Sequence, residues 1–166
     1  MSSRDARFEE VWHSHGAMVA RIASTYEADR EKARELTQDV ALALWRALPG
    51  FRGDGALKAF VARIAHNRAV SHVVKARSEP RSAEIDDQIP SSAPLAEAIL
   101  VESDERARLV AAVRALPIGY AQVVSLALEN FSTGEIATLL GITEGNVAVR
   151  MTRAKIMLKQ ALGSRT

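Results

Sequence analysis

The chain of 166 residues contains no cysteine, which excludes disulfides, thiol catalysis and cysteine-ligated zinc sites. Aromatic residues make up only 5% of it, and it has no apolar run of about 18 residues, the length that a membrane-spanning helix needs. Its first residues, MSSRDARFEEVW, carry charges where a signal peptide would have its apolar core. We therefore expect a protein without membrane insertion that stays in the cytoplasm.

Catalytic and metal-binding motifs are also missing. The sequence has no HExxH, no GxSxG and no glycine-rich loop of the Walker type. Its histidines are poorly spaced for one helical face and lack carboxylates at matching positions (His13, His15, His66, His72). We expect no catalytic residue, no metal and no cofactor. An enzyme would need a site that no motif signals, and turnover by the purified chain would reveal it.

The composition, with 48% apolar and 25% charged residues, is that of an ordinary globular protein. The formal net charge is only +2, but the charge is unevenly distributed. Residues 1–78 hold 13 basic and 9 acidic side chains, residues 79–103 hold 1 and 6, and residues 104–166 hold 8 and 5. The net charges are therefore +4, −5 and +3, so two basic blocks flank an acidic strip.

The acidic strip also concentrates residues that interrupt helices (Pro80, Pro90, Pro94, Ser82, Ser91, Ser92). Proline removes a backbone donor and disfavours helix in the residue before it. We predict a domain at 1–78, a linker at 79–95 and a second domain at 96–166. The negative charge of the linker either solvates an exposed tether or lies on a basic surface that nucleic acid would otherwise occupy.

Outside the linker, apolar residues recur at the helical intervals of three and four. The clearest segment is 30–48, whose apolar residues fall on one face (Ala33, Leu36, Val40, Leu44, Leu48). Similar patterns predict helices at 8–27, 57–75 and 95–116. No alternating pattern typical of a strand occurs, so we predict an all-α fold of two small helical domains.

The strongest local signal is the segment FSTGEIATLLGITEGNVAVRMTRAKIMLKQAL at 131–162. Ser132 and Glu135 have the spacing of a capping box, which starts a helix directly after the serine. Gly141 suits the left-handed turn that ends this helix, and Thr143 can cap a second helix. A helix, a short turn with glycine and a second helix make a helix-turn-helix; a solvated helical hairpin is the alternative.

The second helix of a helix-turn-helix enters the major groove with its N-terminal residues facing the bases. Asparagine can bond adenine, arginine can bond guanine, and further basic residues suit phosphates. We predict that DNA is read by the outward face of this helix (Thr143, Glu144, Gly145, Asn146, Arg150, Arg153).

A second basic segment, residues 52–77, holds six basic side chains and a single acid, Asp54. It also contains Phe60, His66 and Asn67. Charge, hydrogen-bonding groups and an aromatic face are what a protein needs to grip phosphates and stack exposed bases. A solvated helix face with a core aromatic explains the same pattern equally well.

Two stretches of the chain resemble a known family. They are ELTQDVALALWRALPGFRGDGALKAFVARIAHNRAV at 35–70 and LPIGYAQVVSLALENFSTGEIATLLGITEGNVAVRMTRAKIMLKQAL at 116–162. In this order they are similar to regions 2 and 4 of the extracytoplasmic-function (ECF) group of bacterial sigma-70 family sigma factors. The resemblance implies a protein that directs core RNA polymerase to promoters in response to an envelope or stress signal. It also implies an anti-sigma factor as a partner.

The resemblance further implies three sets of site residues. Core polymerase would be bound by the helix at 30–48 (Glu35, Gln38, Asp39, Trp45). The −10 promoter element would be opened, with one base flipped into a pocket, by the loop and helix that follow (Phe51, Arg52, Lys58, Phe60, Arg63, His66, Asn67, Arg68). The −35 element would be read by the second helix of the helix-turn-helix.

The sequence departs from the family pattern at a few positions. Lys32 and Arg34 stand where the family usually has acids, which would turn attraction to a basic polymerase surface into repulsion of about 1 kcal/mol per exposed pair. Phosphorylation of Thr37 would restore negative charge there. Phe60 stands where tryptophan is common, and Ala148 stands where lysine is frequent, so we expect fewer phosphate contacts at the −35 element.

Two other functions stay open. A conventional helix-turn-helix repressor or activator would bind duplex DNA without polymerase, and it would have no reason to carry residues 35–70. A sigma-like protein that sequesters an anti-sigma factor would fit the altered charges at Lys32 and Arg34. Run-off transcription with core polymerase separates these functions from that of a sigma factor.

Overall fold

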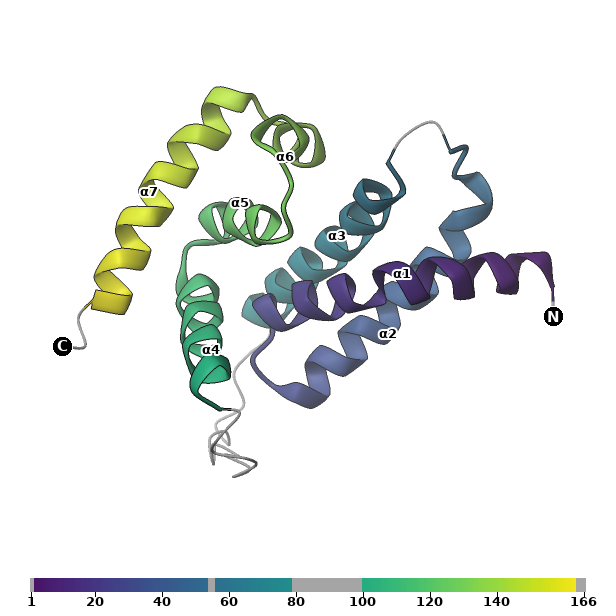
Figure 1. The fold of residues 1–166 in the computed structure, drawn as a ribbon, viewed down its shortest axis with the longest axis horizontal. Coiled ribbons are helices and arrows are strands. Elements are labelled where there is room, and N and C mark those ends of the chain that lie inside the picture. Colours follow the sequence, from purple (N-terminus) through teal and green to yellow (C-terminus); the bar gives the residue numbers. More distant parts are fainter. Residues whose placement is uncertain (1, 54–55, 79–99, 164–166) are drawn as a thin grey trace.

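The computed structural model describes residues 2–53, 56–78 and 100–163, with the backbone alone at 100–103. This part of the chain contains seven α-helices, one 3-10 turn and no strand (Figure 1), so the predicted all-α fold is confirmed. In chain order the elements are α1 Ser3–Tyr26, α2 Arg30–Ala47, the 3-10 turn Leu48–Gly50, α3 Leu57–Ser78, α4 Leu100–Ala115, α5 Ile118–Leu128, α6 Thr133–Leu140 and α7 Glu144–Gly163. The predicted linker at 79–95 lies outside the described residues, and the domain limits that depend on it stay a prediction.

Helix α1 starts at Ser3, earlier than the predicted start at residue 8, because a capping box precedes it. The Ser2 hydroxyl accepts a hydrogen bond from the Asp5 backbone N–H at 3.1 Å, and the Asp5 carboxylate accepts one from the Ser2 N–H at 3.4 Å. The Trp45 indole N–H also donates to Asp5 Oδ1 at 2.9 Å. This indole bond, together with the cap, lowers the pKa of Asp5. The start of α1 is thus tied to the far end of α2.

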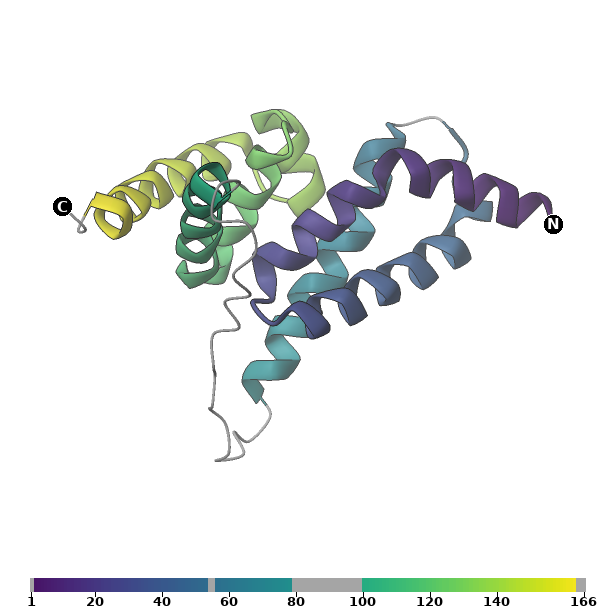
Figure 2. The same cartoon turned by 60° about the horizontal axis from the view of Figure 1, so that its bottom comes forward.

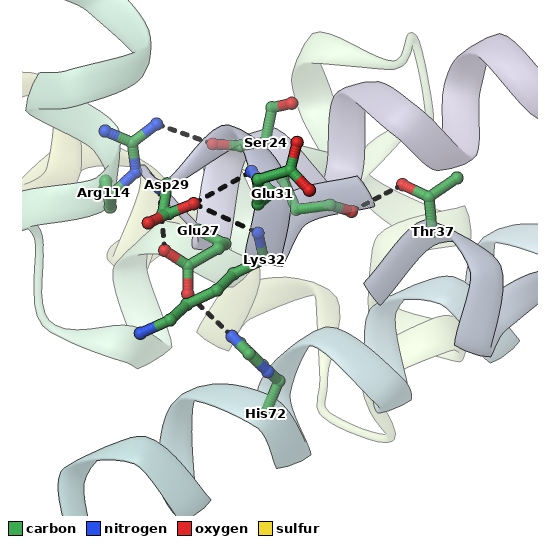
Figure 3. Close-up of polar contacts among 9 residues, drawn as sticks. Ser24, Glu27, Asp29, Glu31, Lys32, Thr37, His72 and Arg114 are labelled. Atoms are coloured by element: carbon green, nitrogen blue, oxygen red, sulfur yellow. Dashed lines mark hydrogen bonds and ion pairs between the residues drawn. The ribbon is translucent and has the colours of Figure 1, made fainter. Parts of the chain in front are cut away.

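Helix α2 buries the face that its sequence predicts. All five of its predicted core positions are buried between α1 and α3 (Ala33, Leu36, Val40, Leu44, Leu48). Asp29 caps the helix by accepting hydrogen bonds from the backbone N–H groups of Glu31 at 2.9 Å and Lys32 at 3.2 Å (Figure 3). Helices α1, α2 and α3 therefore form a three-helix bundle whose outer α2 face is free to carry polar residues.

Helix α5 is the centre of the C-terminal group, and no periodicity in the sequence predicts it. Most of its residues between Ala121 and Leu126 are buried, and it packs against α4, α6 and α7. A helix that is covered on nearly every side keeps no polar stripe, so its 3.6-residue period does not show in the sequence. The buried helix α5 thus packs against both helices of the helix-turn-helix, α6 and α7, and holds them in place.

The two groups of helices also pack against each other (Figures 1 and 2). Helix α1 contacts α4, and α3 contacts α6. Buried apolar residues from both groups form one continuous cluster. Among the described helices, none combines the length and the apolar character needed to cross a bilayer.

Candidate nucleic-acid interface

The turn between α6 and α7 has the geometry that the sequence predicts. The Ser132 hydroxyl accepts from the Glu135 N–H at 3.1 Å, and Glu135 Oε1 accepts from the Ser132 N–H at 2.8 Å. These two bonds with Ser132 lower the pKa of the Glu135 carboxyl. Gly141 ends α6 with φ of 69°, in the left-handed region that favours glycine. The predicted capping box and turn are confirmed.

Thr143 positions the second helix of the motif. Its hydroxyl accepts from the Asn146 N–H at 3.1 Å, which is the predicted cap of α7. Val147 and Ala154 of α7 are buried, as are Ile136 and Ala137 of α6. The burial of this face leaves the opposite face of α7 pointing outward.

Most of the predicted −35 residues lie on that outward face. Thr143, Glu144, Gly145, Asn146 and Arg153 are exposed. The Glu144 carboxylate, however, lies at the start of α6. A Cβ added to Gly134 would come within 2.8 Å of Glu144 Oε1. An acid at a helix N-terminus is stabilised by the helix dipole, so the start of α6 is a favourable place for the Glu144 carboxylate.

Arg150 differs from its neighbours because it is half-buried and already has partners in the chain. Its Nε donates to Asn146 Oδ1 at 3.0 Å. Its guanidinium also lies over α5, where a Cβ added to Gly119 would come within 3.3 Å of Nη1. Arg150 therefore holds the Asn146 amide in one orientation, with the amide nitrogen left to donate.

Val149 is a candidate that the sequence reasoning missed. Its residue is 49% exposed, an unusual place for a large apolar side chain, and it follows Asn146 by three positions and precedes Arg153 by four. Residues three and four apart share a helix face, so Val149 lies on the proposed reading face. Apolar side chains contact the methyl group of thymine in the major groove. The sequence carried a signal for it, because Val149 is a β-branched apolar residue on the face of the helix that does not belong to the core.

On the N-terminal bundle, two of the predicted −10 residues form an aromatic pair. The ring centroids of Phe51 and Phe60 are 4.7 Å apart, with the planes tilted by 39°. Arg7 fixes the loop before α3 by donating to the backbone oxygens of Leu48 at 3.2 Å and Phe51 at 3.3 Å. The pair provides a stacking surface at the start of α3.

The polar residues of this region differ in how far they are exposed to solvent. Arg52, Arg63, Asn67 and Arg68 are exposed, and Lys58 is half-buried. Arg68 pairs with Asp39 of α2 at 3.4 Å, and both side chains are about half exposed (48% and 50%). Such an exposed pair contributes little to stability, so Arg68 is available to another anion.

For His66 the structure corrects the sequence prediction. Its residue is only 4% exposed, so it does not lie on a DNA-facing surface. Nδ1 lies 3.4 Å from the hydroxyl of Tyr26, and Nε2 is buried without a hydrogen-bond partner among the described residues. Burial lowers the pKa of His66 to about 4. His66 is therefore an interior residue in spite of its polar side chain, because α3 turns this position toward α1.

The structure places the predicted polymerase-binding residues in two different environments. Glu35, Gln38 and Asp39 are exposed on α2. Trp45 is half-buried: its N–H is bonded to Asp5, and the Arg4 guanidinium lies 4.2 Å from its ring centroid. Trp45 thus ties the end of α2 to α1, whereas Glu35 and Gln38 are exposed to solvent and Asp39 is exposed but paired with Arg68.

The first turn of α2 carries the charge reversal noted in the sequence. Lys32 and Arg34 are exposed, and the Thr37 hydroxyl donates to the Ala33 backbone oxygen at 2.9 Å (Figure 3). Nearby, His72 Nε2 lies 2.8 Å from Glu27 Oε1. In the described part of the chain, no group of three or more histidines and carboxylates is placed to hold a metal ion.

The fold and this surface define a helix-turn-helix protein with a second, basic and aromatic, helical bundle. Residues 11–79 match the family described as Sigma-70 region 2, and residues 106–158 match Sigma-70, region 4. The ECF RNA polymerase sigma factor SigM of Mycobacterium tuberculosis is 27% identical over 157 residues, which cover 94% of this chain and 77% of that protein. The RNA polymerase sigma-H factor of Pseudomonas aeruginosa is 29% identical over 144 residues, covering 81% and 75%.

Two solved structures have the same fold. CnrH, solved in complex with the cytosolic domain of CnrY, superposes with a TM-score of 0.72 at 23% identity, covering 98% of this chain and 91% of that one. The sigma factor RpoE of Bartonella quintana, solved in complex with the anti-sigma factor NepR, gives a TM-score of 0.71 at 20% identity, covering 96% and 99%. The chain belongs to the extracytoplasmic-function group of the bacterial sigma-70 family of RNA polymerase sigma factors.

Proposed function

We propose that this chain recruits core RNA polymerase through α2 and places it on a promoter through two separate DNA contacts, made by α3 and α7. The observation that carries the proposal is the presence of both DNA-binding devices in one chain. A repressor needs the helix-turn-helix of α6 and α7, but it has no use for a basic helix that begins with an aromatic pair. RNA synthesis itself belongs to the polymerase, and this chain supplies recognition in the cytoplasm.

At the −35 element, α7 lies in the major groove and reads bases with Asn146, Val149 and Arg153. Arg150 acts through Asn146 by fixing its amide, so the amide nitrogen faces an acceptor on a base edge. Val149 beside it favours a thymine methyl group. Lys155 and Lys159, both exposed further along α7, meet phosphates, which carry no sequence information.

At the −10 element, Phe51 and Phe60 provide the stacking surface for an exposed base, and the nearby cations hold the backbone. Base–aromatic stacking contributes about 1–3 kcal/mol per base, which is comparable with the few kcal/mol needed to remove a base from the stack. Arg52, Arg63 and Arg68 supply the positive charge. His66 is left out of this set because it is buried.

Polymerase is bound by the exposed polar residues of α2, namely Glu35, Gln38 and Asp39. An anti-sigma factor is a further partner, as it is for the RpoE protein of Bartonella quintana. Such a partner would keep the chain from competing for polymerase in the absence of a signal. A sigma-like protein that only sequesters an anti-sigma factor is the second candidate, favoured by the basic Lys32 and Arg34 at the start of α2.

Run-off transcription tests the proposal. Core polymerase, this chain and a library of promoter fragments are incubated, and the transcript starts are mapped. We expect initiation at discrete sites that share two spaced elements. DNA binding without transcription would support a conventional regulator instead, and binding of neither polymerase nor DNA would support the sequestering protein.

Residue-level controls sharpen this test. We expect Asn146→Ala to lose about 1–3 kcal/mol at particular −35 base pairs and Lys159→Ala to weaken all sequences alike. Uniform weakening by both variants would show that α7 does not read bases.

A further inference from the structure

We propose that a cavity between α1, α3, α4 and α5 is a binding site for a small carboxylate with an apolar body, such as a short fatty acid or an aromatic acid. The cavity has a volume of about 190 Å³, which is smaller than the pockets of about 300–1,000 Å³ that hold drug-sized ligands. None of its lining residues belongs to the DNA-binding or polymerase-binding sets proposed above. The site therefore adds a ligand to the chain and does not depend on the proposed function.

Arg114 of α4 is the main cation of the site. Its Nη2 donates to the Ser24 backbone oxygen at 2.6 Å, whereas its Nε is buried and has no hydrogen-bond partner among the described residues (Figure 3). No carboxylate in the described part of the chain lies within ion-pair distance of its guanidinium. Burial lowers the pKa of Arg114, because the charge has lost water without gaining a full counter-charge. A buried donor without a partner costs free energy, so an anion in the cavity would stabilise this side chain.

Glu27, at the end of α1, is the one acid among the lining residues, and both of its oxygens are already engaged. Oε1 lies 2.8 Å from His72 Nε2, and Oε2 accepts a hydrogen bond from the Asp29 N–H at 2.9 Å (Figure 3). The charge of Glu27 favours the charged form of Arg114, but less than burial opposes it. Glu27 therefore does not replace an anionic ligand.

The lining carries an excess of positive charge. Arg77, exposed near the end of α3, is its second arginine. Two arginines and one glutamate give a formal charge of +1, with His72 counted as neutral. The first turn of α5 adds partial positive charge, because Ile118 lines the cavity and Pro117 before it provides no side-chain cap. One negative charge balances this lining, which favours a carboxylate over a phosphate dianion.

Much of the remaining wall is apolar. Leu116 is buried there, and Val73 and Ile118 are half-buried. Removing apolar ligand surface from water is favourable, whereas a purely inorganic anion would leave these side chains without a partner. Cations beside an apolar wall in so small a space therefore select an acid whose body is one short chain or a single ring.

Titration of the full chain with benzoate tests the site. Isothermal titration calorimetry at constant ionic strength measures the Kd, which we expect to be about 1 mM or lower. Benzyl alcohol has the ring without the charge, and inorganic phosphate has charge without the ring. Each of these two ligands should bind at least about tenfold more weakly than benzoate, because each lacks one half of the recognition.

Four variants connect binding to the cavity. Arg114→Gln should weaken benzoate binding about tenfold, since it removes a charged donor; circular dichroism checks its folding. Arg77→Gln should weaken binding about fivefold, and Ala76→Leu, which fills space in the cavity, about tenfold. Both of these positions are exposed, so neither change should disturb the fold. The matched control is Arg106→Gln, which removes the same charge from an exposed position of α4 outside the cavity and should bind benzoate like the unsubstituted chain.

Nuclear magnetic resonance locates the ligand independently of affinity. In ¹H–¹⁵N spectra we expect the largest benzoate-induced shifts at the backbone N–H groups of Ile118 and Gly119, and none at Gly145 of α7. The proposal would be overturned by an unperturbed start of α5, by equal binding of benzyl alcohol, or by unchanged affinity in both Arg77→Gln and Ala76→Leu. Absence of binding at about 10 mM benzoate would overturn it as well.

Discussion

Mild acid should destabilise this protein through a single buried side chain, His66. This residue is 4% exposed, and its Nδ1 lies 3.4 Å from the hydroxyl of Tyr26 on α1. Burial raises the pKa of Tyr26 and lowers that of His66 to about 4. Both groups are therefore neutral in the folded chain at pH 7, and a proton on His66 would be a buried charge without a partner.

The size of the effect follows from proton linkage. The pKa of His66 is about 4 in the folded chain, against an ordinary value of 6.5, so the unfolded chain binds more protons between these two values. Stability therefore falls as the pH falls through this window. Between pH 7 and pH 5 the free energy of unfolding should decrease by about 2 kcal/mol from this group alone.

Urea unfolding at pH 7 and pH 5, followed by tryptophan fluorescence, measures this decrease. Both tryptophans, Trp12 and Trp45, lie in the bundle that contains His66. The reference is His66→Gln, which keeps a polar side chain but cannot be protonated. All other ionisable groups are the same in the two proteins, so the difference between the two pH dependences isolates His66. Equal losses of stability in the two proteins would refute the reasoning.

Three further predictions concern the turn, the polymerase surface and base reading. Gly141→Ala should destabilise the chain by about 1–2 kcal/mol, because φ is 69° there, whereas Gly50→Ala should have little effect; thermal unfolding by circular dichroism measures both. Lys32→Glu with Arg34→Glu should strengthen binding to core polymerase by about fivefold per residue in a pull-down titration, and unchanged affinity would show that the polymerase does not contact this turn. Val149→Ala should lose about 1 kcal/mol of preference for thymine at one −35 position in a base-substitution series, and an equal loss for every base would contradict a methyl contact.

The order of the helices could be predicted because most of them are amphipathic and carry local caps. The apolar face of α2, the capping box at Ser132 and the turn at Gly141 are all set by residues within a few positions of one another, and each was confirmed. Helix α5 escaped prediction for the opposite reason. Its burial on nearly all sides removes the polar stripe by which a helix is recognised.

The candidate site was predictable by region but not residue by residue. His66, Asn67 and Arg68 are neighbours in sequence and look alike as polar residues, yet His66 is buried and the other two are exposed. Arg150, which the sequence predicted to face DNA, is half-buried and bonded to Asn146, whereas Val149, for which the sequence predicted no role, faces outward. The direction of a side chain depends on which helix packs against it, and that neighbour is remote in the sequence.

The sequence by itself determined an all-helical chain with a helix-turn-helix, a basic aromatic segment and the family to which both belong. These depend on periodicity, caps and short motifs, which act over a few residues. Only the tertiary structure decided that Glu129 would meet Arg21 and Lys58, residues 108 and 71 positions away, and that α6 would pack against α3. Contacts of this kind arise from the packing of whole helices, so no local pattern encodes them.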